Sequence, residues 1–211
     1  MEKTKDAKKM KREGAPLLTP VSRYPEICKT ILLLAMGYCF CFLFLLDYSN
    51  PEMNVFHRES TTSFTVYRHP ILFYIYVALL TLTIFFNLDL ARRRYNNNSR
   101  IVAFLQYLGF IVMCIAVCVK TDLEGPRHVI HLGCSIIFGV ANIACLETLF
   151  FLQTRKDRRF RKFFIGGLIF IAIVLPAFII RLSGIVETVP LLFSMFILYL
   201  VNHTKVIEPA K

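Results

Sequence analysis

Residues 129–152 read VIHLGCSIIFGVANIACLETLFFL, a stretch in which Glu147 is the only formally charged side chain at pH 7. A helix of this length, rising about 1.5 Å per residue, crosses the roughly 30 Å of hydrocarbon in a bilayer. Comparable apolar stretches lie on both sides of it. The expected spans cover residues 30–48, 70–90, 101–119, 129–152, 163–180 and 185–201. The sequence therefore predicts an all-α, polytopic membrane protein, a bundle of six transmembrane helices between tails at 1–29 and 202–211.

The composition argues against several classes of protein. Of the 211 residues, 56% are hydrophobic, more than the ~45–50% typical of a soluble domain, which disfavours an ordinary soluble enzyme or a disordered chain. The net charge is +11, but the basic residues lie between the apolar stretches rather than on one face, so no nucleic-acid partner is expected. The seven cysteines form no CxxC pair and lie in or beside apolar stretches. We expect them to be small buried hydrophobes, not a disulfide framework, and expect no metal site.

Basic residues are distributed unevenly between the two sides of the predicted bundle. Of the 25 Lys and Arg side chains, 20 fall in the two tails and in the loops near residues 92–100 and 155–162, and five fall on the other side. Because cytosolic segments carry the excess of Lys and Arg, both termini are expected in the cytosol. The glycosylation sequons at Asn97 and Asn202 would then also lie in the cytosol and stay unmodified.

Polar side chains recur along one face of the fourth span. His128, His131, Ser135, Phe138 and Asn142 follow one another at spacings of three and four residues, so they share one side of a helix. This stripe is expected to face the interior of the bundle. Two interpretations stay open: a ligand pocket or His-based catalytic or metal site, and a set of hydrogen bonds that fixes helix packing. Packing is the simpler interpretation, because two histidines at this spacing supply only half of a zinc site.

Further charged groups lie near the exoplasmic ends of the spans. The polar cluster expected there consists of Asp122, Glu124, His128, His131, Arg181 and Glu187. Ionisable groups in hydrocarbon are costly and usually pair, so we expect Glu187 to lie near His131, with Arg181 as the competing partner. Near the cytosolic end of the fourth span, Glu147 is expected to be met by Arg155 or by another basic residue of the following loop.

Two short stretches resemble a known family. VIHLG at 129–133, followed by IIFGV at 136–140, is similar to the fourth span of the DRAM family of autophagy-linked lysosomal membrane proteins. SGIVE at 183–187 resembles the start of that family's sixth span. The sequence departs from the family at Thr188, where an aromatic residue is expected. The resemblance implies a six-span fold and a lysosomal membrane, and it implies no particular reaction.

The N-terminal tail holds a candidate sorting signal. Glu13 is followed after three residues by Leu17 and Leu18, a pattern that resembles the acidic dileucine signals bound by coat adaptors. In a cytosolic tail, such a signal directs a protein to endosomes or lysosomes. The alternatives are that this segment is an ordinary linker and that the protein resides in the plasma membrane.

These features favour a non-enzymatic, multi-pass protein of an endolysosomal membrane that acts through contacts with lipid or protein. The link to autophagy depends on the family resemblance, and no catalytic residue or cofactor is assigned. Two alternatives stay open: a small transporter or channel, and a membrane-embedded lipid hydrolase or acyltransferase that uses the exoplasmic His and Asp side chains. Geometry discriminates between them, because an enzyme needs those groups to converge on a cavity that opens to lipid or lumen.

Replacing Leu17 and Leu18 with Ala is expected to move a tagged protein from endolysosomes to the plasma membrane, because the adaptor loses the side chains that it binds. Imaging and surface biotinylation measure the change. Thr19→Ala, just outside the pattern, is the control and is expected to leave the distribution unchanged. Endolysosomal localisation of the double variant would show that residues 13–18 are a linker.

Overall fold

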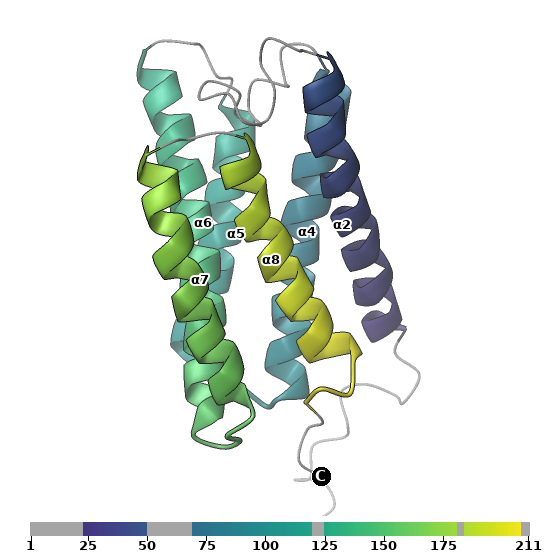
Figure 1. Ribbon diagram of the computed structural model, residues 1–211, viewed down its shortest axis with the longest axis vertical. Coiled ribbons are helices and arrows are strands. Elements are labelled where there is room, and N and C mark those ends of the chain that lie inside the picture. Colours follow the sequence, from purple (N-terminus) through teal and green to yellow (C-terminus); the bar gives the residue numbers. More distant parts are fainter. Residues whose placement is uncertain (1–22, 50–68, 120–124, 181–183, 208–211) are drawn as a thin grey trace, which may run out of the picture.

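The computed structural model describes residues 23–49, 69–119, 125–180 and 184–207. These residues form six α-helices and no strand: α2 Tyr24–Ser49, α4 Pro70–Arg94, α5 Arg100–Cys118, α6 Pro126–Thr154, α7 Phe160–Ile180 and α8 Gly184–His203. Each helix is long and apolar enough to cross a membrane. The predicted six-helix membrane fold is therefore confirmed, and the helices lie side by side along one long axis (Figure 1).

Local sequence signals determine several helix ends. Pro70 and Pro126 lie in the first turns of α4 and α6, where a missing N–H leaves no helical bond unmade. The turn between α4 and α5 is short because Asn96 adopts a left-handed conformation, with φ of 47°, which Asn tolerates better than most residues. Ser99 then caps α5 by accepting a hydrogen bond from a backbone N–H of the first turn.

Helices α4 and α8 connect the two sides of the bundle. α2 packs against both of them, whereas α5 and α6 form the most extensive helix pair and also contact α4. α7 packs against α6 and α8, and only 11% of its candidate span is buried. α2 begins and α8 ends at the same end of the bundle (Figure 1). We call this the basic end, because Arg92, Arg93 and Arg94 form the last turn of α4 there.

The outer surface of the bundle is apolar. Along α5, the side chains of Ile101, Phe104, Tyr107, Ile111 and Ile115 are between 44% and 64% exposed. They recur at helical spacing, so they form a stripe on the side of α5 that faces away from the other helices. A continuous apolar surface of this kind is unfavourable in water and needs no partner in hydrocarbon. The pattern is that of helices embedded in a bilayer.

Asn87 of α4 is the centre of a buried polar network at the basic end. Its Nδ2 donates to the Cys28 carbonyl oxygen of α2 at 3.2 Å and to the Thr83 carbonyl oxygen at 3.0 Å. Its Oδ1 lies 2.9 Å from Nε2 of His203, and its backbone oxygen accepts a hydrogen bond from Asn202 Nδ2 at 2.8 Å. One fully buried side chain thus joins α2, α4 and α8, and no water competes for these bonds in hydrocarbon.

The first turn of α2 extends this network toward the surface. The Tyr24 hydroxyl donates to a carboxylate oxygen of Asp89 at 2.8 Å, and Arg93 pairs with the same carboxylate at 2.7 Å. The Arg93 guanidinium also lies 5.4 Å from the centre of the Tyr24 ring. These contacts explain why α2 begins at Tyr24, one to two turns before the expected start near residue 30, where the apolar stretch begins.

Replacing Asn87 with Ala is expected to destabilise the protein by about 1–3 kcal/mol, because buried partners on α2 and α8 lose their hydrogen bonds. The midpoint of thermal unfolding in detergent measures the loss. Asn98, which is exposed in the turn after α4, provides the matched control, and Asn98→Ala is expected to leave the midpoint unchanged. Equal midpoints for the two variants would show that the network contributes nothing to stability.

Candidate functional site

A cavity of about 250 Å³ lies inside the bundle, and every helix from α4 to α8 contributes to its lining. Its walls are mainly apolar, and they include Phe73 and Leu80 of α4, Met113 of α5, Phe138 of α6, Val174 of α7 and Leu191 of α8. A single water molecule needs only about 10–15 Å³ of such space. The cavity therefore has room for part of a lipid chain in a bundle that is otherwise closely packed.

The cavity reaches the outer surface of the bundle between α6 and α7. Ile136 and Val140 of α6 line it and are 42% and 61% exposed, and Leu175 of α7 lines it and is 56% exposed. Side chains that border both the cavity and the surroundings mark an opening in its wall. In a bilayer this opening faces the hydrocarbon, so an apolar chain can enter from the membrane without crossing water.

The polar stripe of the fourth span forms one edge of this cavity. His131, Ser135 and Asn142 line it from α6, and Glu187 lines it from the first turn of α8. Tyr76 of α4, which sequence analysis did not single out, is also part of the lining. The cavity thus combines extensive apolar walls with a narrow polar edge.

The structure describes the side chains of two members of the expected exoplasmic cluster, His131 and Glu187, and both line the cavity. His128 lies in the first turn of α6, but its side chain is outside the described set. The other members also lie outside the described residues: Asp122, Glu124 and Arg181. The same is true of the sorting residues Glu13, Leu17 and Leu18.

The stripe residues are held by hydrogen bonds to nearby backbone. Ser135 Oγ donates to the His131 carbonyl oxygen at 2.9 Å, and Asn142 Nδ2 donates to the Phe138 carbonyl oxygen at 2.8 Å. Nδ1 of His131 lies 2.9 Å from the Ala116 carbonyl oxygen of α5, and because a carbonyl only accepts, this contact requires the proton on Nδ1. Helix packing therefore explains these bonds. It does not explain why the stripe borders a cavity.

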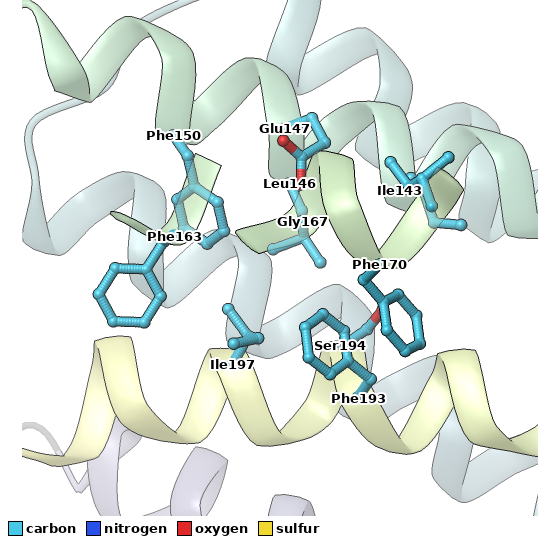
Figure 2. Close-up of a pocket in the computed structure, with 11 residues that line it drawn as sticks. Ile143, Leu146, Glu147, Phe150, Phe163, Gly167, Phe170, Phe193, Ser194 and Ile197 are labelled. Atoms are coloured by element: carbon cyan, nitrogen blue, oxygen red, sulfur yellow. The ribbon is translucent and has the colours of Figure 1, made fainter. Parts of the chain in front are cut away.

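A second and smaller chamber, of about 20 Å³, lies beside Glu147 of α6 (Figure 2). Glu147 Oε2 is buried and has no hydrogen-bond partner among the residues that the structure describes. Arg155, the partner expected for Glu147, contacts an aromatic ring instead: its guanidinium lies 5.2 Å from the centre of the Phe151 ring. Eight residues at about 100° each place Arg155 about 80° around the helix from Glu147. The prediction that Arg155 meets Glu147 is therefore wrong.

Glu147 lies against α7 because residue 167 is a glycine. A methyl group at Gly167 would overlap the Glu147 carboxylate, whereas a methyl group at Gly166 would meet nothing within 4 Å. Figure 2 shows the carboxylate of Glu147 directed toward Gly167, with aromatic side chains around them. The sequence predicted no role for Gly167. Its only signal was a pair of glycines in a span of large apolar residues.

The chamber and the cavity are neighbours. They share four wall residues: Ile143 of α6, Phe170 and Ile171 of α7, and Ser194 of α8. Ser194 Oγ donates to the Pro190 carbonyl oxygen at 2.9 Å, so this hydroxyl is satisfied within its own helix. The two spaces together follow the interior from the first turn of α8 to the last third of α6.

The arrangement is suited to binding an elongated molecule with an apolar body and a polar group. Apolar walls with a few placed polar side chains are typical of ligand sites. In the described ranges, no three His, Cys, Asp or Glu side chains are grouped so that they could hold a metal ion.

Comparison with known proteins identifies no relative. No family model matches the chain, and neither a curated protein nor a solved structure is significantly similar to it. The resemblance to the DRAM family therefore stays a prediction from the short stretches quoted above. Function has to be inferred from the cavity, its polar edge and the chamber beside Glu147.

Proposed function

We propose that this multi-pass membrane protein binds a single-chain amphiphile inside its helix bundle, without converting it chemically. The observation that carries this proposal is the cavity of about 250 Å³, with its apolar walls, its polar edge and its opening between α6 and α7. The hydrocarbon chain of the amphiphile would occupy the apolar part and gain the contacts that the helices lack there. Its polar group would bind one of the two polar sites that border this space, which are the edge formed by His131, Ser135 and Glu187 and the Glu147 carboxylate in the adjoining chamber.

An amphiphile suits this cavity better than an aqueous solute does. A polar molecule surrounded by walls such as Phe73, Leu80 and Val174 would lose its water without regaining hydrogen bonds, at a cost of roughly 1–3 kcal/mol for each unpaired group. An apolar chain loses nothing on the same walls. The opening between α6 and α7 also leads to the hydrocarbon, where amphiphiles reside.

We further propose that the protein resides in an endolysosomal membrane with both termini in the cytosol. The excess of Lys and Arg in the tails and in the loops of the basic end supports this orientation. The pattern at residues 13–18 and the resemblance to the DRAM family support the location, and the resemblance alone supports a link to autophagy. In this orientation the wider cavity lies in the lumenal half of the membrane.

Filling the cavity tests the binding proposal. Gly139 lines the cavity, and a Cβ atom added there meets nothing within 4 Å. The Cβ position is therefore open, and Gly139→Leu is expected to place its side chain in the cavity. The amount of lipid that copurifies, measured by mass spectrometry per mole of protein, should fall several-fold, while the midpoint of thermal unfolding stays the same or rises.

Gly166→Leu is the matched control for this experiment. Gly166 also has open space at its Cβ position, but it lies on the exposed side of α7 and does not line the cavity. Its variant is expected to retain the lipid of the wild type. Full retention of lipid by Gly139→Leu would contradict the proposal, because lipid bound only to the outer surface does not sense an internal side chain.

Two exposed arginines at opposite ends of the bundle test the orientation. Arg158 lies in the turn between α6 and α7 at the basic end, and Arg127 lies in the first turn of α6 at the other end. In intact endolysosomes, Arg158→Cys is expected to react with a membrane-impermeant maleimide, and Arg127→Cys is expected to react only after permeabilisation. The wild-type chain gives the background from native cysteines, and the reverse pattern would overturn the orientation.

A further inference from the structure

The chamber beside Glu147 combines a carboxylate with an aromatic lining. Four phenylalanines line it, Phe150, Phe163, Phe170 and Phe193, and Glu147 provides the carboxylate. Oε2 of this carboxylate is buried without a hydrogen-bond partner in the described part of the chain. Glu147 as a whole is half-buried, but a buried acceptor atom without a donor is unfavourable. A ligand group that donates a hydrogen bond to this oxygen would therefore be favoured at the site.

The size of the chamber restricts this group. Its volume is about 20 Å³, and one water molecule needs about 10–15 Å³ of such space. A primary ammonium group is close to a water molecule in size and carries three N–H donors. A trimethylammonium group is much larger and has no N–H, so it fits neither the volume nor the unpaired oxygen.

Charge favours a cation at this site. Among the residues that the structure describes, the titratable side chains lining the chamber and the cavity are Tyr76, His131, Glu147 and Glu187, and no described Lys or Arg lines either space. A carboxylate forms shorter and stronger hydrogen bonds with an ammonium donor than with a neutral one. Phenylalanine rings attract an ammonium group through their π-electrons. An anionic head group would meet repulsion from Glu147 instead.

We propose that the amphiphile is a long-chain primary amine, whose ammonium group binds Glu147 and whose hydrocarbon chain lies in the larger cavity. This rests on the proposed function, because the chain needs that cavity. The two spaces share the wall residues Ile143, Phe170, Ile171 and Ser194, so the site for the head group and the site for the chain are adjacent. Because residue 167 on α7 is a glycine, the Glu147 carboxylate can extend into the chamber.

A panel of ligands with one chain length tests the head-group selection. The full-length protein in detergent is titrated with octadecylamine, octadecyltrimethylammonium and stearate, and the shift of the thermal midpoint gives the affinity of each. Octadecylamine is expected to bind at least tenfold more tightly than the other two. Propylamine, with the same head group and almost no chain, is expected to bind far more weakly, because it gains nothing in the cavity.

Three variants test the role of the carboxylate. Glu147→Gln keeps the size of the side chain and removes its charge. Gly167→Ala places a methyl group where the carboxylate lies, whereas Gly166→Ala, one residue earlier, meets open space. The first two variants are expected to bind octadecylamine at least tenfold more weakly than the wild type, and Gly166→Ala is expected to bind it as the wild type does. Without ligand, the midpoint of Gly167→Ala should be close to that of the wild type, because the group it displaces is the flexible end of a side chain. The midpoint of Glu147→Gln should not fall, because the two side chains have the same size.

Several outcomes would overturn the proposal. Unchanged octadecylamine binding by Glu147→Gln, or equal binding of the primary and the quaternary amine, would mean that the chamber holds only water. Propylamine that binds as tightly as octadecylamine would show that the cavity does not hold the chain.

Failure of the proposed function gives a different pattern. If Gly139→Leu weakens binding of all three long chains and Glu147→Gln has no effect, the cavity binds amphiphiles and the amine proposal alone falls. If Gly139→Leu leaves the affinities of all three long-chain ligands unchanged, the proposed function itself fails, and the amine proposal falls with it.

Discussion

Hydrocarbon supplies no hydrogen-bond partner, and this constraint determines where the polar side chains of the bundle lie. The backbone satisfies itself within the helices. Polar side chains inside the bundle then have two environments. Asn87 bonds to backbone and side-chain partners on α2 and α8 and closes the basic end. His131, Glu187 and Glu147 instead border internal spaces. The bundle is thus cross-linked at one end, and the larger cavity lies between the parts of its helices nearer the other end.

The position of α7 accounts for the opening of this cavity. Helices α5 and α6 pack closely along their length: on α5, a Cβ atom at Gly109 would come within 3.3 Å of the Asn142 amide of α6. α7 has no comparable buried polar contact in the described residues, and its candidate span is 11% buried. Its large side chains face outward, as Ile169 and Ile173 do with exposed fractions of 57% and 67%. A helix held mainly by apolar contacts, which lipid chains can replace, forms the natural wall of a site open to lipid.

The sequence predicted the helices better than the spaces between them. Length and hydropathy identify each span because hydrocarbon thickness is a strong constraint, and the spacing of His131, Ser135 and Asn142 identifies the face of α6 that lines the cavity. Spacing cannot tell whether a neighbouring helix fills the space opposite that face. Likewise, hydropathy placed the start of the first helix near residue 30, whereas polar contacts of Tyr24 extend it. The cavity opposite α6 and the early start of α2 both depend on tertiary contacts, which the sequence of a single helix does not encode.

The surroundings of Glu147 argue against a simple structural ion pair. Basic side chains are plentiful at the nearby basic end, and two of them have partners other than Glu147: Arg92 donates to Gln106 Oε1 at 2.9 Å, and Arg155 lies over an aromatic ring. Arg159 pairs with Asp157 at 2.7 Å, and its hydrogen bonds hold the pKa of that carboxyl below its ordinary value. Asp157 shows how a carboxylate in this loop is stabilised, by an arginine two residues away. Glu147 Oε2 has no such partner among the described residues, and the residue opposite it on α7 is a glycine. A carboxylate kept among phenylalanines, beside a space the size of one small polar group, is best explained by a cation that arrives with a ligand.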